Sequence, residues 1–175
     1  MKRIFLIGYM GVGKTTAGRE LAKAMDLEFI DLDHFIQTRY NKTIAQLFEE
    51  GGEEKFREIE HNVLKEIADF EDVIVSTGGG APCFFNNIEV MNEAGITVYL
   101  KATPELLAAR LNTCKEKRPL IKDKNEEELL AFVAANLEKR EPFYGQAKIV
   151  FETEELVNRE DVTGYVLKLV NKIKK

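Results

Sequence analysis

The sequence predicts an α/β fold, in which helices cover both faces of a parallel β-sheet. Short apolar, β-branched segments alternate along the chain with longer segments of helical spacing, which is typical of βαβ units. The segment at residues 73–77 is apolar almost throughout, as expected for a strand that a parallel sheet buries on both faces. A glycine-rich loop at residues 8–15 joins the first expected strand to the first expected helix.

The composition is that of an ordinary globular protein. The 175 residues are enough for one domain with a sizeable core, and 45% of them are hydrophobic and 31% charged. A net charge of −5, with acids and bases interspersed, argues against a surface that binds nucleic acid. No stretch is long and apolar enough to cross a membrane, and the apolar residues 4–7 are too few for the core of a signal peptide.

The two cysteines, Cys83 and Cys114, lie far apart in the sequence and match no metal-ligand spacing. Such cysteines are expected to be reduced thiols and not parts of a disulfide framework or a zinc site. We therefore expect a cytoplasmic protein that has neither nucleic acid nor a membrane as a partner.

Strands and helices alternate from one end of the chain to the other. Thr43 and Gln46 form a capping box for a helix that should stop at Gly51 and Gly52, and Pro142 should end a later helix. The expected strands are residues 2–7, 28–33, 73–77, 96–100 and 147–151. The expected helices are residues 16–25, 34–40, 43–51, 53–68, 87–94, 103–111, 125–140 and 159–172, and residues 112–124 are expected to form an exposed, mobile loop.

Residues 8–15 read GYMGVGKT, which matches the pattern G-x-x-x-x-G-K-[ST]. Between a strand and a helix, this pattern indicates a P-loop, whose backbone N–H groups and helix N-terminus surround an anion. Lys14 could then reach the outer phosphates of a nucleoside triphosphate, and the Thr15 hydroxyl could bind Mg²⁺. The alternative is a chance match in a glycine-bearing turn, which the flanking strand and helix disfavour.

Two acids end the second expected strand. In an extended backbone, Asp31 and Asp33 would point toward the same face, within reach of a metal ion and a transferred phosphoryl group. Because ligands of parallel sheets gather at the carboxyl ends of strands, these acids, the P-loop and residues 78–80 should share one edge. The alternative is that both acids cap the next helix or face solvent.

Two arginines are candidates for binding a carboxylate. Arg57 has glutamates at i−4 and i+3, so a surface ion pair explains it equally well. Arg140 has no acid at i±3 or i±4, which favours a ligand role. The planar guanidinium group suits a carboxylate because it can donate two parallel hydrogen bonds.

Three consecutive glycines, at residues 78–80, follow the buried third strand. They could form only a tight turn, but they would also let a ligand approach the backbone closely. Arg118 lies in the basic loop and is either a solvated charge or part of a lid that brings a cation to the phosphoryl group. His34 and His61 are interpreted as surface residues of helices, without a role.

These residues together resemble the shikimate kinase family. The resemblance covers roughly residues 1–150 and rests on motifs that occur in family order behind the P-loop. They are FIDLD at 29–33, GEEKFREIE at 52–60, STGGGA at 76–81, RPL at 118–120 and REPFY at 140–144.

The resemblance implies a three-layer α/β/α P-loop kinase fold with a five-stranded parallel sheet in the order 2-3-1-4-5. It implies one domain over residues 1–175, with acceptor-binding helices at about 33–62 and a lid at about 112–124. The implied reaction is transfer of the γ-phosphoryl group of ATP to the 3-hydroxyl of shikimate, in aromatic amino acid biosynthesis. ATP and Mg²⁺ would be required, and we expect a monomer.

The resemblance also implies a role for each matching residue. Asp33, Lys14 and Arg118 would be catalytic, and Thr15 and Asp31 would hold Mg²⁺, the latter through water. The acceptor would be bound by Asp33, Arg57, Gly79, Gly80 and Arg140. The nucleotide would be bound by Gly11, Val12, Gly13, Lys14, Thr15, Thr16, Arg110 and Arg118.

The sequence departs from the family pattern at residues 82–85, which read PCFF after the triple glycine, and at residues 152–161 on the adenine side. Two alternatives stay open at this point. One is another small-molecule P-loop kinase, such as a gluconate or nucleotide kinase. The other is a regulatory NTPase, which would hydrolyse its nucleotide with water and need no acceptor pocket.

Overall fold

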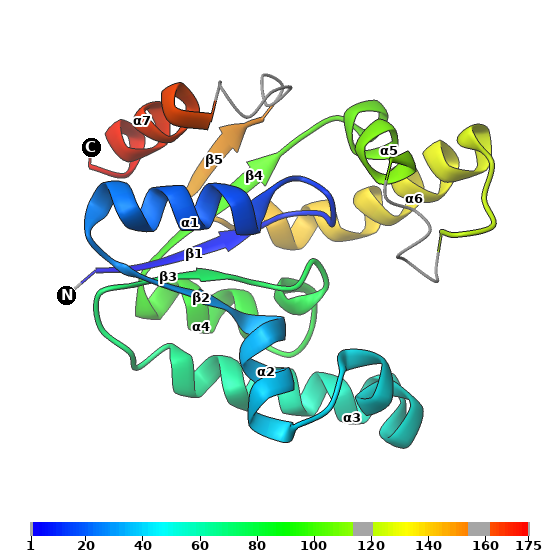
Figure 1. Cartoon of the computed structure of the whole chain (residues 1–175), viewed down its shortest axis with the longest axis horizontal. Coiled ribbons are helices and arrows are strands. Elements are labelled where there is room, and N and C mark those ends of the chain that lie inside the picture. Colours follow the sequence, from blue (N-terminus) through cyan, green and yellow to red (C-terminus); the bar gives the residue numbers. More distant parts are fainter. Residues whose placement is uncertain (1, 114–120, 154–161, 175) are drawn as a thin grey trace.

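The structure, a computed structural model, describes residues 2–113, 121–153 and 162–174. A five-stranded parallel sheet with the order β2-β3-β1-β4-β5 lies at its centre (Figure 1). Both the α/β prediction and the strand order are confirmed. The strands are β1 (Arg3–Ile7), β2 (Glu28–Asp31), β3 (Val73–Ser76), β4 (Ile96–Lys101) and β5 (Ile149–Glu152).

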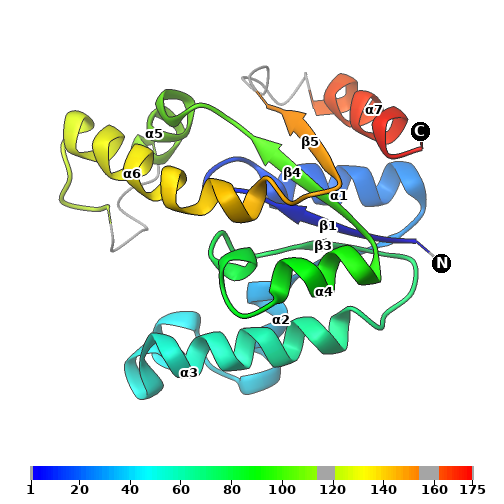
Figure 2. The ribbon, with the colours of Figure 1, turned by 180° about the vertical axis from the view of Figure 1, so that it is seen from behind.

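Helices cover both faces of the sheet and complete three layers. Figure 1 shows α1 and α7 on one face, and Figure 2, seen from behind, shows α4 and α6 on the other. The pair α2 and α3 lies beside the β2 end of the sheet, and α5 packs on α6 near the carboxyl ends of the strands. The helices are α1 (Lys14–Met25), α2 (Leu32–Tyr40), α3 (Ile44–Ile67), α4 (Asn87–Ala94), α5 (Pro104–Asn112), α6 (Glu126–Tyr144) and α7 (Val162–Ile173).

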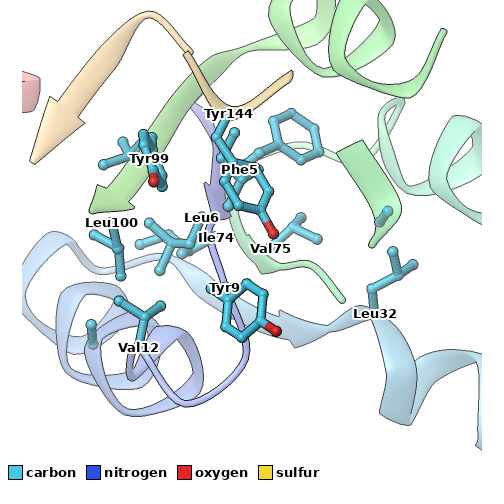
Figure 3. Close-up of a cluster of buried hydrophobic side chains, with 14 of the residues drawn as sticks. Phe5, Leu6, Tyr9, Val12, Leu32, Ile74, Val75, Tyr99, Leu100 and Tyr144 are labelled. Carbon is cyan, nitrogen blue, oxygen red and sulfur yellow. The ribbon is translucent and has the colours of Figure 1, made fainter. Parts of the chain in front are cut away.

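The hydrophobic core follows the central strands. All four residues of β3 are buried, as are the last four of β1, which matches the uninterrupted apolar pattern of both segments. Figure 3 shows this cluster, in which Tyr9, Tyr99 and Tyr144 extend the core toward the carboxyl ends of the strands. The Tyr99 hydroxyl donates to Glu141 Oε2 at 2.7 Å, so its polar end has a partner. The hydrophobic core therefore packs directly against the loops that follow the carboxyl ends of the strands.

Two predicted boundaries near the start of the chain are wrong. α1 begins at Lys14, two residues early, because Gly13 already serves as its N-cap. β2 ends at Asp31, whose Oδ1 accepts a hydrogen bond from His34 N at 3.1 Å and caps α2. Asp33 consequently lies in the first turn of a helix and not on a strand, so the two acids do not share a strand face.

The predicted break at Gly51 and Gly52 is confirmed. α3 consists of two helical segments that meet at Gly52, whose backbone is not helical (φ 71°, ψ 180°), and the capping box of Thr43 is also present. Two other features differ from the prediction. α6 runs past Arg140 and through Pro142 to Tyr144, beyond its predicted end. A short 3₁₀-helix, η1 (Ala81–Cys83), follows the triple glycine and was not predicted. Within the described residues, none of the helices has the length and hydropathy needed to cross a membrane.

Candidate active site

A cavity of about 270 Å³ opens at the carboxyl ends of the central strands. The P-loop, the two acids at the end of β2 and the start of α2, and the residues at the end of β3 line it together: Met10, Gly11, Gly13, Lys14, Thr15, Thr16, Asp31, Asp33, Ser76, Thr77, Gly78 and Gly79. A larger cavity, of about 530 Å³, lies between the ends of β4 and β5 and helix α6, and the P-loop contributes nothing to it. The smaller cavity is therefore the candidate site, because the P-loop and two acids line it.

The P-loop is folded as a cradle for an anion. Gly13 has a φ of 101°, which a residue with a side chain rarely adopts, and this turns the chain directly into α1. The Lys14 ammonium lies inside the loop, donating to the carbonyl oxygens of Gly8 at 2.7 Å and Tyr9 at 3.0 Å. A positive charge, a helix N-terminus and a glycine-rich backbone thus meet at one place, which fits the phosphates of a nucleotide.

A hydroxyl and a carboxylate lie together next to this cradle. Thr15 Oγ1 donates to Asp31 Oδ2 at 3.0 Å, while Asp31 Oδ1 remains bound to the first turn of α2. No cluster of three or more His, Cys, Asp or Glu side chains suited to a metal occurs in the described part of the chain. Mg²⁺ at nucleotide sites takes few protein ligands and keeps waters and phosphate oxygens, so this sparse pair fits it.

The three glycines bring the predicted acceptor residues together. A Cβ on Gly78 would lie 3.2 Å from both Asp33 Oδ1 and Glu60 Oε1. On Gly79 it would lie 3.2 Å from an Arg140 nitrogen, and on Gly80 it would lie only 2.6 Å from an Arg57 nitrogen. Asp33, Arg57 and Arg140 come from three helices far apart in sequence, yet all three reach this one turn. A side chain at the third position would displace the guanidinium of Arg57 from its present place.

Arg57 forms the ion pairs that one interpretation predicts, and it also has an unpartnered donor that suits the other, a ligand role. Its side chain, 12% exposed, pairs with Glu60 at 2.7 Å and with Glu53 at 3.3 Å, as the helical spacing predicts. Its Nε is buried and has no hydrogen-bond partner in the structure. A buried donor without a partner is costly, so this edge of the guanidinium is suited to a ligand oxygen.

Arg140 is held by aromatic groups. Its guanidinium lies over the ring of Tyr9, 5.2 Å from the ring centroid, and it forms no ion pair with the described residues. Tyr144, one turn later on α6, donates its hydroxyl to the Gly79 carbonyl at 2.5 Å. The end of α6 is thereby tied to the triple glycine, and this tie keeps Arg140 at the pocket.

Two acids of the pocket hold their protons more tightly than usual. Burial raises the pKa of Asp33, the nearby Asp31 raises it further, and Lys14 and Arg57 oppose the shift. Burial also raises the pKa of Glu60, which is 1% exposed, and its ion pair with Arg57 opposes this shift. A raised pKa brings a carboxylate closer to the range in which it can accept a proton in a reaction.

The remaining predicted residues are placed less centrally. Arg110, on α5, donates to the Val12 carbonyl at 3.0 Å and so contacts the outer side of the P-loop. Arg118 and most of the predicted lid, residues 114–120, lie outside the described residues.

Three further residues that lie at the site, Glu60, Tyr9 and Tyr144, were not predicted from the sequence. The spacing between Arg57 and Glu60 indicates their ion pair, but nothing in it reveals that Glu60 is buried. Tyr144 stands at i+4 from Arg140 and ends the REPFY motif, but that motif indicates no contact for it. Tyr9 lies within the P-loop motif at a position that the pattern leaves free.

Comparisons with known proteins agree with this geometry. The sequence model of a family described as shikimate kinase matches residues 10–171. The chain is 59% identical over 162 residues to a shikimate kinase of Parabacteroides distasonis, and the alignment covers 93% of this chain and 94% of that relative. It is 52% identical over 175 residues to a shikimate kinase of Phocaeicola vulgatus, with 100% of both chains covered.

Solved structures give the same result. The crystal structure of shikimate kinase from Bacteroides thetaiotaomicron matches with a TM-score of 0.95 and 47% identity, and the match covers 99% of both chains. A shikimate kinase from Acinetobacter baumannii in complex with shikimate matches with a TM-score of 0.82 and 37% identity, over 99% of this chain and 96% of that one.

Asp33→Asn is expected to stabilise the fold at pH 7 by about 0.5–2 kcal/mol, the usual range for favourable single changes. Folding raises the pKa of Asp33, so above that pKa the folded protein holds an ionised carboxylate where it is disfavoured. The asparagine removes this cost, and the gain should shrink as the pH falls toward about 4, where the unfolded chain also binds the proton.

Urea unfolding of parent and variant at pH 7 and pH 4 measures this difference. Asp69→Asn, the same change at an exposed position after α3, is the matched control and should show little effect. An Asp33→Asn variant less stable than the parent at pH 7 would contradict the assigned sign.

Proposed function

The chain belongs to the shikimate kinase family, and from this we infer that it transfers the γ-phosphoryl group of ATP to the 3-hydroxyl of shikimate. The enzyme is thus an ATP-dependent kinase with an alcohol acceptor. One observation carries the assignment to a site: Asp33, Arg57 and Arg140 meet around the triple glycine, beside the P-loop. A hydroxylated carboxylic acid needs such a set of one acid and two guanidinium groups.

The arginines are proposed to bind the carboxylate of shikimate. Arg57 offers an unpartnered Nε, and the guanidinium of Arg140 lies against Gly79 of the same turn, so both can donate to one planar anion. Gly79 lines the cavity, and it and Gly80, which is buried next to the guanidinium of Arg57, are proposed to contact the acceptor through their backbones. Together they would fix the ring so that its 3-hydroxyl points toward the P-loop.

Asp33 is proposed to hold the reacting hydroxyl and to accept its proton. It lies between the P-loop and Gly78, and burial together with Asp31 raises its pKa toward a useful range. Since phosphoryl transfer passes through a loose transition state, holding the acceptor in line contributes more than strong proton abstraction. Lys14 would stay on the phosphates and balance the charge that moves to the leaving oxygen.

The nucleotide side is proposed to follow the P-loop. Gly11, Val12, Gly13 and Thr16 would surround the phosphates with backbone and hydroxyl groups, and Arg110 would lie toward the adenine. Thr15 and, through water, Asp31 would hold Mg²⁺, which supplies positive charge to the phosphate oxygens when bound. Arg118 would bring a further cation from the lid.

We propose further that residues 1–175 act as one monomeric kinase domain in the cytoplasm, without nucleic-acid or membrane partners. Residues 33–62 would contact the acceptor, in keeping with the positions of Asp33 and Arg57 on α2 and α3. Residues 112–124 would close over the phosphates as a lid.

A coupled assay of ADP formation from ATP and Mg²⁺ tests the acceptor assignment. Shikimate, gluconate and nucleoside monophosphates are offered separately, and only shikimate is expected to raise ADP release well above the rate without an acceptor. Equal ADP release with and without each acceptor would indicate an NTPase, and a response to gluconate or a nucleotide instead would indicate a different kinase.

Asp33→Asn is expected to lower kcat by about 10²–10⁴-fold, the usual contribution of a positioned acid or base, and to leave ATP binding intact. Steady-state kinetics and a separate ATP titration measure the two effects. Asp69→Asn again serves as the control, with unchanged kcat. A parent-like turnover number for Asp33→Asn would remove this residue from the mechanism.

Arg57→Lys is expected to raise the KM for shikimate roughly 10–100-fold, because an ammonium group cannot reproduce a forked, charge-assisted contact worth about 1.5–3 kcal/mol. The KM for ATP should change little. Arg39→Lys, at an exposed arginine of α2 that pairs with Glu66, is the control. The role of Arg57 is refuted if the variant and the parent share one shikimate KM.

A further inference from the structure

An aromatic side chain covers the guanidinium of Arg57. The Cζ atom of Arg57 lies 4.1 Å from the ring centroid of Phe84, compared with 5.3 Å for Phe56 and 6.0 Å for Phe48. Attraction between a cation and an aromatic face acts within about 6 Å of the centroid, so Phe84 is the ring placed to interact most strongly. Phe56 and Phe48 belong to α3, which carries Arg57 itself, whereas Phe84 reaches it from the segment after the triple glycine.

The ion pairs of Arg57 lie at the edge of its guanidinium group and leave one flat face of that group to Phe84. Glu60 and Glu53 accept hydrogen bonds from the terminal nitrogens, which lie at the edge of the guanidinium plane. Of these two acids only Glu60 is buried, since the Glu53 side chain is 60% exposed and gives a weak, screened contact. Edge contacts restrain the guanidinium poorly against tilting out of its plane. A ring on its face restrains that tilt and also excludes water.

The segment that carries Phe84 is tied down on both sides. Cys83 N donates to the Gly80 carbonyl at 2.9 Å, and Asn87 N donates to the Phe84 carbonyl at 3.2 Å. The fully buried side chain of Asn87 donates to the Ala81 carbonyl at 2.8 Å and contacts His61 Nδ1 on α3 at 2.6 Å. The turn is therefore held to the same helix that carries Arg57.

The backbone next to Phe84 is strained. Phe85 has a φ of 50°, in the left-handed region that a bulky residue rarely adopts. This conformation lets two consecutive phenylalanines separate: Phe84 packs on Arg57, while Phe85 stays 58% exposed and lies against the ring of His61. Strain of this kind persists only where the surroundings hold it, and it often marks a site of function.

We propose that Phe84 is a positioning residue for shikimate binding, which holds the guanidinium of Arg57 in the orientation that grips the acceptor carboxylate. This proposal rests on the carboxylate role of Arg57 given above. The ring holds the guanidinium plane beside the triple glycine and lowers the freedom that Arg57 loses when the acid binds.

Phe84→Leu, which keeps an apolar side chain but removes the ring, tests the proposal. The KM for shikimate should rise about 3–30-fold, the loss expected for a partly buried cation–π contact, while kcat and the KM for ATP stay within about twofold. Phe84→Tyr keeps the ring and should restore the parent KM. Phe85→Leu, at the neighbouring ring that lies on His61 instead, is the matched control and should leave all three constants unchanged.

A double-mutant cycle with Arg57→Lys shows whether Phe84 acts through Arg57. Non-additive effects on the shikimate KM are expected, because the ring has no guanidinium to hold in the lysine variant. Additive effects, an unchanged KM in Phe84→Leu, or an equal rise in Phe85→Leu would each overturn the proposal. If Arg57→Lys raises the KM while Phe84→Leu does not, only the role of Phe84 fails. An unchanged KM in Arg57→Lys would instead refute the proposed binding mode from which this inference starts.

Discussion

The pairing of β1 with β3 is the constraint on which the rest of the structure depends. The parallel ladder sets Leu6 opposite Ser76, and just beyond it Thr77 N donates to the Leu6 carbonyl at 3.2 Å. The P-loop leaves the end of β1 and the triple glycine leaves the end of β3, so this register forces two glycine-rich loops to lie side by side. A slip of one residue would reverse which face each side chain of β1 occupies and would separate the loops. Backbone pairing thus brings the P-loop and the triple glycine together, and the contact of Arg140 with the Tyr9 ring adds to it.

Around these loops the site balances its own charges. The positive charges of Arg57 and Arg140 oppose the negative charges of Asp33 and Glu60, and Lys14 contributes a further positive charge from the P-loop. Burial alone would make each acid costly, and the arginines offset part of that cost. Because Arg57 is already paired with Glu60 at 2.7 Å, the proposed carboxylate ligand would not meet a free cation but would join an existing ion pair. Such a site is oriented before its ligand arrives, which reduces the entropy lost on binding.

The sequence predicted best those features whose information is local. The P-loop, the buried strands and the capping box of Thr43 each depend on a few neighbouring residues, and the structure has all of them. The order of the strands and the grouping of distant acceptor residues came from the family resemblance, since no local pattern specifies them. Asp33 was misplaced because the alternation in residues 29–33 fits a strand, while the cap formed by Asp31 ends that strand early. α6 continues through Pro142 to Tyr144, whose hydroxyl binds Gly79, 65 residues away, and short-range patterns cannot reveal a contact of that range.

Asp31 links two elements through the two oxygens of one carboxylate. One oxygen accepts from the first turn of α2, and the other accepts from Thr15 in the first turn of α1. This double use narrows the substitutions that the position can tolerate. Asparagine would retain one acceptor and replace the other with a donor, and glutamate would carry the same group one methylene too far to cap the helix. Changes at Thr15 and at the start of α2 should therefore show epistasis with each other, although these two segments share no direct bond.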